Sequence, residues 1–282
     1  MGMQINTNLA ANNTYRNLNA TQNDLSKSLE KLSSGLRINR AADDAAGLSI
    51  SEGLRSQVGG LTVAARNAQD GISVVQTAEG GLTEVHSILQ RVRDLAVQAG
   101  NDSNNADARK AIGTEVTALT EELTRISAST NFNGINLLDA SAGADTDGVM
   151  KFQVGAGGTA AADQIKVDLS KADIGAVATT ISGLEFDTAD NAQLAILELD
   201  KQITAVSTVR SELGAVQNRF EHSIASTNVA KENLTAANSR IRDVDMAEEM
   251  VKYTRSNVLS QAGQAMLAQA NQSTQGVLSL LR

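Results

Sequence analysis

The stretch LRSQVGGLTVAARNAQDGISVVQTAEGGLTEVHSILQRVRDLAVQA at positions 54–99 carries the strongest structural signal in the chain. Its apolar residues recur at alternating steps of four and three, with one phase slip between Ile72 and Ala78. This spacing is typical of a helix that buries one stripe in a coiled coil or bundle. At about 1.5 Å per residue the helix would be roughly 70 Å long, so it needs partner helices. The stripe comprises Leu54, Val58, Leu61, Ala65, Ala68, Ile72, Val75, Ala78, Leu82, Val85, Leu89, Val92, Ala96 and Ala99.

The same periodicity predicts partner helices on both sides of this stretch. Leu25, Leu29, Leu32 and Leu36 predict a helix that ends near residue 36. Further helices are expected over about 106–128, 190–236 and 244–281. The two helices nearest the ends of the sequence have thin apolar stripes and many asparagines or glutamines, so they would fray alone. An isolated helical bundle and a self-assembling rod both remain open at this point.

The middle of the chain has a different pattern. Between about 130 and 185, the segments KFQV and QIKVDL alternate apolar and polar residues at period two, which predicts one or two short hairpins. The fold class is therefore mainly α: long antiparallel helices form coiled-coil or bundle rods, with a small β-hairpin region in the middle of the chain.

Composition narrows the functional classes. The 282 residues include six aromatic residues, two histidines, and no cysteine or proline. The net charge of −8 is concentrated between 139 and 200, where acids outnumber bases eleven to three. No basic stripe is present for nucleic acid, no window is apolar enough for membrane insertion, and no catalytic, cofactor or metal-ligand motif is evident. The sequence therefore predicts a protein that is not an enzyme and has no cofactor.

Two charged segments interrupt the helical pattern at similar distances from the two ends. They are LSSGLRINRAADDAAGLSIS at 32–51 and SRIRDVDMAEEM at 239–250. Glycine weakens a helix, aspartates favour a helix start, and arginines donate bidentate hydrogen bonds to neighbouring groups. We expect contacts between subunits here, with local caps and ion pairs within one chain as the alternative. The residues concerned are Gly35, Arg37, Arg40, Asp43, Asp44, Arg240, Arg242, Asp243 and Asp245.

Several long blocks, in the same order, resemble bacterial flagellin. They are QINTNLAA at 4–11, the segment 32–80, LQRVRDLAVQAGN at 89–101, NFNGINLL at 131–138, ELGAVQNRFEHSI at 212–224, NLTAANSRIRDVDMAEEM at 233–250 and VLSLLR at 277–282. The resemblance covers about 1–138 and 190–282. Only about 50 residues separate these blocks, so the chain resembles a minimal flagellin without large outer domains.

The resemblance implies two domains. The inner D0 layer would be a terminal coiled coil with its connecting spoke, formed by 1–44 and 240–282. The D1 rod would comprise 45–239, including the hairpin segment at about 130–185. D0 packing is expected from apolar residues of both end helices: Leu18, Leu25, Leu29, Leu32, Val251, Val258, Met266, Val277 and Leu281.

The implied function is a structural subunit that self-assembles through its terminal helices into a hollow flagellar filament for motility. The alternatives are a hook–filament junction protein and a secreted ligand that acts mainly in host interaction. An enzyme-bearing flagellin is opposed by the missing catalytic residues.

Partners and location also follow from the resemblance. The chain is expected to form a homopolymer and to meet an export chaperone, the type III export apparatus, and the hook-associated junction and cap proteins. MGMQINTNLAANN lacks the features of a signal peptide, so extracellular export without a cleaved signal is expected. Toll-like receptor 5 would bind a face containing Arg91, Leu95 and Glu115; burial of Leu95 and an assembly role for Arg91 are the alternatives.

Overall fold

The computed structural model describes the backbone of residues 8–280 and the side chains of residues 8–272. Contacts divide the chain into two compact units. We call residues 1–56 with 233–282 the terminal unit, and residues 57–232 the central unit. The two sequence ends thus belong to one unit, with the middle of the chain in the other.

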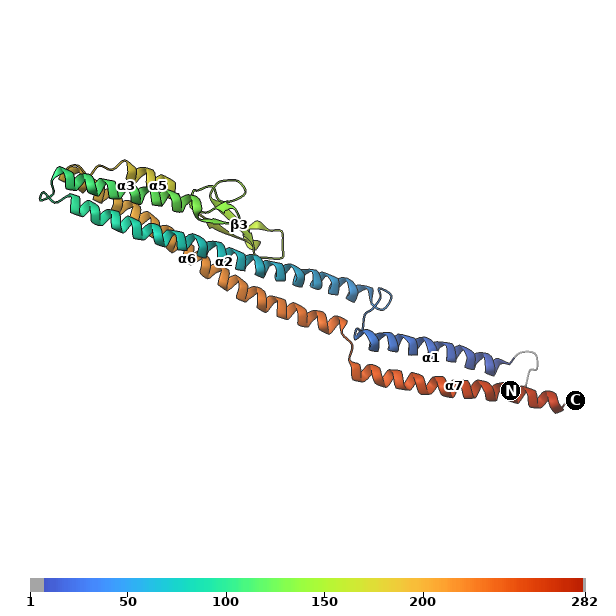
Figure 1. Cartoon of the computed structure of the whole chain (residues 1–282). Coiled ribbons are helices and arrows are strands. Elements are labelled where there is room, and N and C mark those ends of the chain that lie inside the picture. The colour runs from blue at the N-terminus through green and yellow to red at the C-terminus, as the bar shows by residue number, and fades with distance from the viewer. Residues whose placement is uncertain (1–7, 281–282) are drawn as a thin grey trace. The chain divides into compact units, whose positions relative to one another are not determined.

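Long helices dominate both units (Figure 1). The helices are α1 (Leu9–Ser34), α2 (Ala45–Ala99), α3 (Ala106–Ser129), α4 (Ala160–Asp163), α5 (Ile174–Ser182), α6 (Ala189–Arg242) and α7 (Met246–Leu280). The strands are β1 (Asn131–Phe132), β2 (Ile135–Asn136), β3 (Val149–Gln153) and β4 (Gln164–Asp168). The mainly helical fold class is therefore confirmed, and each long helix expected from periodicity is present.

The core of the central unit follows the predicted stripe of α2. From Ala68 onward the stripe is buried, whereas its earlier members are half-buried. The partners of the stripe include Leu123 of α3, Ile181 of α5 and Leu199 of α6. Burial of these aliphatic side chains supplies the main stabilising free energy of the unit. The alternating spacing in the sequence thus identifies the buried face.

The predicted hairpin is present in the middle of the chain. β3 and β4 pair antiparallel, with Lys151 opposite Lys166. The end of β3 packs on α2, where Asn67 donates its side-chain amide to the carbonyl of Gln153 at 3.0 Å. A second, two-residue hairpin joins β1 to β2 through a turn at Asn133 and Gly134, both of which have positive φ. The hairpin region is therefore attached to the helical rod of the same unit.

The hairpin expectation for 130–185 was wrong at its end, because α5 is a helix. Its buried residues are spaced for one helical face: Ile174, Val177, Ala178 and Ile181. The side chain of Asp173 caps the helix by accepting from the backbone N–H of Ala176 at 2.9 Å. Helix α5 lies beside α3 (Figure 1), and its last residues, with the segment that follows, form one wall of a groove described below.

Helices α1 and α7 form an antiparallel pair in the terminal unit (Figure 1). One end of the pair is fixed by Asn8, whose side-chain amide donates to the carbonyl of Ala270 at 3.0 Å. At the other end, Leu36 and Asp243 form an isolated antiparallel bridge. The helices nearest the two sequence ends therefore run along one another.

Candidate assembly surfaces

The two charged segments pair with each other through the backbone. Gly35 ends α1 with φ of 73°, a left-handed conformation that favours glycine. The backbone N–H of Arg37 donates to the carbonyl of Arg242 at 2.6 Å, and that of Val244 donates to the carbonyl of Gly35 at 3.1 Å. We call residues 35–44 and 240–245 together the hinge. The glycine and the two segments were all identified from the sequence, but their mutual pairing was not.

Three hinge arginines have partners within the chain. The guanidinium of Arg37 donates twice to the carbonyl of Ile241, at 3.1 and 2.7 Å. Arg40 pairs with Glu30 at 2.9 Å, and Arg242 pairs with Glu52 at 2.8 Å. Local pairing was the alternative to contacts between subunits. Most of these side chains are exposed, so the local bonds leave surface for a neighbouring copy.

Two of the hinge aspartates, Asp44 and Asp245, cap the helices that follow them. Asp44 accepts from the backbone N–H of Gly47 at 2.8 Å and so caps α2. Asp245 accepts from the N–H groups of Ala247 and Glu248 at 2.9 and 3.2 Å and so caps α7. The side chain of Asp243 accepts from the hydroxyl of Ser239. Asp44 and Asp245 therefore hold helix starts, whereas Asp243 bonds to a side chain near the end of α6.

Asp43 holds the hinge loop rather than a helix. Its carboxylate accepts from the backbone N–H groups of Asn39 and Arg40, at 3.1 and 3.0 Å. These bonds, the one from Arg40 first, lower the pKa of Asp43 below its ordinary value, and the nearby charges of Lys31 and Lys27 act in the same direction. The loop conformation is therefore coupled to the negative charge of this carboxylate.

A hollow of 700 Å³ lies in the terminal unit between the hinge, α1 and the start of α7. Both signs of charge line it. The basic residues are Lys27, Lys31, Arg37, Arg240 and Lys252, and the acidic ones are Asp43, Asp44, Asp243, Asp245, Glu248 and Glu249. Such mixed lining suits a charged polypeptide surface of complementary pattern.

The seam between α1 and α7 is not the apolar seam that we expected. On α7 the least exposed positions follow steps of four and three: Glu249, Tyr253, Ser256, Ser260, Gly263, Leu267 and Ala270. On α1 they are Ala11, Thr14, Leu18, Thr21, Leu25, Ser28 and Leu32. Leu18, Leu25 and Leu32 thus reach the seam as expected. Small and polar residues supply most of the remainder.

The other expected D0 packing residues point away from that seam. The exposed fractions are 54% for Leu29, 59% for Val251, 60% for Val258 and 59% for Met266. These four residues therefore do not pack between α1 and α7 of one chain, and their D0 packing stays a prediction. The physical reason is that α7 has two stripes, and the small-residue stripe allows the closer approach to α1. Val277 and Leu281 lie outside the residues whose side chains are described.

Further large apolar residues, which sequence reasoning missed, accompany them on the exposed surface of the terminal unit. We define the apolar stripe of the terminal helices as Leu9, Tyr15, Leu29, Met246, Met250, Val251, Val258, Leu259 and Met266. An accumulation of large exposed apolar side chains on one pair of helices is typical of a surface that associates with other polypeptides. The sequence signal that could have revealed this is the spacing of small residues on α7, at Ser256, Ser260, Gly263 and Ala270. Their steps of four, three and seven mark the side of the helix that faces α1.

The three residues of the expected receptor face differ in their exposure to solvent. Arg91 is exposed and Glu115 is half-buried, and Nε and Nη2 of Arg91 both donate to Oε1 of Glu115, at 2.9 and 2.6 Å. Leu95 is only 2% exposed and belongs to the core of the central unit. The first two residues therefore offer a polar surface, whereas the leucine supports α2 from inside.

Two further kinds of site concern membranes and metal ions. Within 8–280, no helix is both long enough and apolar enough to cross a membrane. Nor do the described side chains bring together three or more potential metal ligands.

Comparison with known proteins agrees with this picture. Residues 5–143 match the bacterial flagellin N-terminal helical region, and residues 196–281 match the bacterial flagellin C-terminal helical region. The flagellin of Halalkalibacterium halodurans is 54% identical over 280 residues, covering 99% of this chain and 100% of the relative. The flagellin of Bacillus subtilis is 50% identical over 311 residues, with the same two coverages.

A solved structure extends the comparison at the level of fold. The putative flagellar hook-associated protein of Vibrio parahaemolyticus has a TM-score of 0.56 and 13% identity, over 71% of this chain and 100% of that one. At that identity the likeness concerns the fold alone. With both helical regions matched and full-length relatives at about half identity, the chain belongs to the bacterial flagellin family, the structural subunits of the flagellar filament.

Proposed function

We propose that the chain polymerises through its terminal helices into a hollow helical filament that is rotated for motility. The observation that carries this proposal is the apolar stripe of the terminal helices, which the chain leaves uncovered while it buries small and polar residues in the α1–α7 seam. Covering such a stripe with neighbouring copies removes apolar area from water and drives association. The terminal unit would then be the inner D0 layer, and the central unit the D1 rod.

The hinge supports a second set of contacts between copies. Its mixed-charge hollow presents side chains of both signs, and Arg40 is 73% exposed at its side chain. Guanidinium groups form bidentate bonds with carboxylates across interfaces. We assign the nine hinge residues named from the sequence to subunit contacts in the filament, in addition to their bonds within the chain.

The same proposal assigns the partners met before and after polymerisation. An export chaperone would cover α7 and its apolar stripe, and the type III export apparatus would carry the chain outside the cell without a cleaved signal peptide. The hook-associated junction and cap proteins would meet the two ends of the filament. These roles follow from family membership and from a stripe that requires cover in the unassembled chain.

Recognition by Toll-like receptor 5 belongs to the free subunit in this proposal. The surface pair of Arg91 and Glu115 would supply the polar contacts, and Leu95 would hold α2 in position from the core. Removal of the charged side chain of either Arg91 or Glu115 should weaken binding to the isolated receptor ectodomain. The helix content of the variant chain should remain unchanged. A secreted ligand without assembly activity would keep receptor binding but form no filament.

A substitution in the apolar stripe tests the assembly proposal. Val258→Glu places a charge on the exposed surface of α7, so the monomer should fold normally while seeded growth of filaments falls severalfold or stops. Gln261→Glu is the matched control, because it adds the same charge at an exposed polar position of the same helix. Circular dichroism measures folding, and sedimentation with electron microscopy measures growth. Equal growth of both variants would contradict the proposal.

A further inference from the structure

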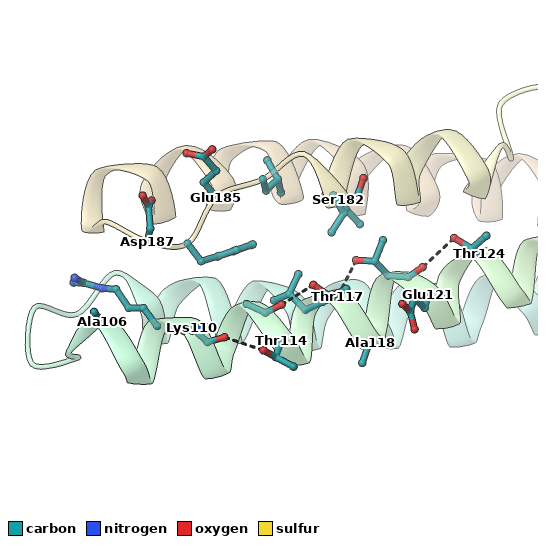
Figure 2. A pocket seen from close by; sticks show the side chains of 17 residues that line it. Ala106, Lys110, Thr114, Thr117, Ala118, Glu121, Thr124, Ser182, Glu185 and Asp187 are labelled. Atoms are coloured by element: carbon teal, nitrogen blue, oxygen red, sulfur yellow. Dashed lines mark hydrogen bonds between the residues drawn. The ribbon is translucent and has the colours of Figure 1, made fainter.

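A groove of 1010 Å³ runs along the central unit between α3 and the segment from Ile181 to Asp187 (Figure 2). Its floor is apolar and buried: Val116, Ile181 and Phe186 are 4%, 1% and 6% exposed. Gly113 and Thr117 lie in the middle of its α3 wall, so this part of the wall carries only small side chains. The groove is therefore shaped to receive apolar side chains from another polypeptide.

Charges of opposite sign stand toward the two ends of the α3 wall. Lys110 and Glu121 both line the groove, eleven residues apart on one face of the helix. At 1.5 Å per residue their separation along the axis is about 16 Å. Neither forms an ion pair with any of the residues whose side chains are described. An occupant with an acid and a base at the same separation would satisfy both.

The outward face of α6 has that pattern. Leu194 and Leu197 are 64% and 61% exposed, although most large apolar residues of this helix are covered. Asp190 precedes them by one turn and Lys201 follows by one turn, so the four residues form one stripe. The acid and the base are again eleven residues apart, and their order is the reverse of the order on α3.

We propose that this stripe of α6 docks into the α3–α5 groove of a second copy of the chain, with the two helices parallel. Asp190 then faces Lys110, Lys201 faces Glu121, and the two leucines enter the groove. To reach Glu121 of the second copy, Lys201 gives up its ion pair with Glu198 of its own helix. A surface ion pair contributes little free energy, so breaking it costs little. The docking rests on the proposed polymerisation and adds to it a lateral contact made by the central unit.

The geometry of this contact favours an extended array. Groove and stripe are different surfaces of one molecule, so each copy can receive one neighbour and insert into another. Such a heterologous contact builds open helical assemblies when it does not close into a ring. The paired charges contribute specificity and orientation, and the buried leucines contribute affinity.

Charge exchange tests the proposed pairing in the full chain. Lys110→Glu and Asp190→Lys each place like charges opposite one another, so each should raise the concentration needed for seeded filament growth severalfold. The combined variant restores opposite charges and should return growth to the level of the unsubstituted chain. Lys166→Glu, on the exposed hairpin strand β4, is the control for net charge. Additive defects in the combined variant would overturn the pairing.

Crosslinking gives a second readout that does not depend on the growth rate. The chain has no cysteine, so Thr117→Cys and Leu197→Cys, which face each other in the proposed register, can be introduced on separate copies and mixed before assembly. A short bis-maleimide should join the two kinds of copy in filaments, whereas Thr117→Cys mixed with Ser87→Cys should give little product. Filaments without the first product would overturn the docking and leave the proposed function intact. No filaments from the unsubstituted chain would overturn both.

Discussion

Gly71 of α2 makes room for the aromatic contact in the central unit. A Cβ atom at this position would lie 2.6 Å from Cζ of Phe220, which is fully buried. The Phe220 ring meets Phe152 edge-on, with centroids 5.6 Å apart and an interplanar angle of 88°. In a chain with six aromatic residues, this contact links α2 and α6 to the hairpin.

Two glycine substitutions in α2 should have opposite effects on stability. Gly71→Ala should lower the free energy of unfolding by about 1–3 kcal/mol, because the ring has no free space into which to move. Gly80→Ala meets no atom within 4 Å and should raise it by about 0.5–1 kcal/mol through helix propensity. Urea unfolding of unassembled protein measures both. A stabilised Gly71→Ala variant would contradict the packing described here.

The hinge loop should lose order in acid through Asp43. Its folded pKa lies below the ordinary value, so its contribution is present above the unfolded pKa of about 3.9 and is lost as pH falls through that value toward the folded one. Protection of the backbone amides of Asn39 and Arg40 against hydrogen exchange should fall over this range. Asp43→Ala should lack that protection at neutral pH, whereas Asp70→Ala should retain it. Unchanged protection in Asp43→Ala would contradict the assignment.

At the scale of the element, α7 shows what periodicity predicts and what it leaves open. The helix was expected over about 244–281 and is observed from Met246 to Leu280. Its apolar residues were expected to pack within D0, whereas in the single chain small and polar residues face α1 and Val258 and Met266 are exposed. A stripe indicates that a helix face is covered, but its sequence does not specify whether the cover comes from the same chain or from another copy.

The side chain of Asp245, which caps α7, should contribute to the stability of that helix. Asp245→Ala removes the acceptor for the backbone N–H groups of Ala247 and Glu248, and should cost about 1 kcal/mol of helix stability. Asp245→Asn keeps a side-chain oxygen and should retain most of it. Hydrogen exchange at the first turn of α7, compared with the middle of the helix, measures the effect. Equal exchange in all three proteins would show that the cap does not hold the helix start.

At the scale of the whole molecule, sequence reasoning predicted the long helices, the central hairpin and the two charged segments. It did not predict the pairing of those segments with each other, because backbone contacts such as that between Arg37 and Arg242 leave no periodic signal. It also missed α5 and the groove beside it, since a nine-residue helix is too short to give a clear periodic pattern. The surfaces that we propose to meet other copies were therefore the least predictable part of the chain.

The central claim is that the two terminal segments drive polymerisation, and one measurement tests it most directly. Full-length protein and a version lacking residues 1–40 and 245–282 are compared by sedimentation and electron microscopy after the addition of filament seeds. We predict that the full chain grows filaments and that the truncated chain stays monomeric while keeping the helix content of its central unit. A full chain that remains a compact monomer, or a truncated chain that grows equally well, would contradict the account.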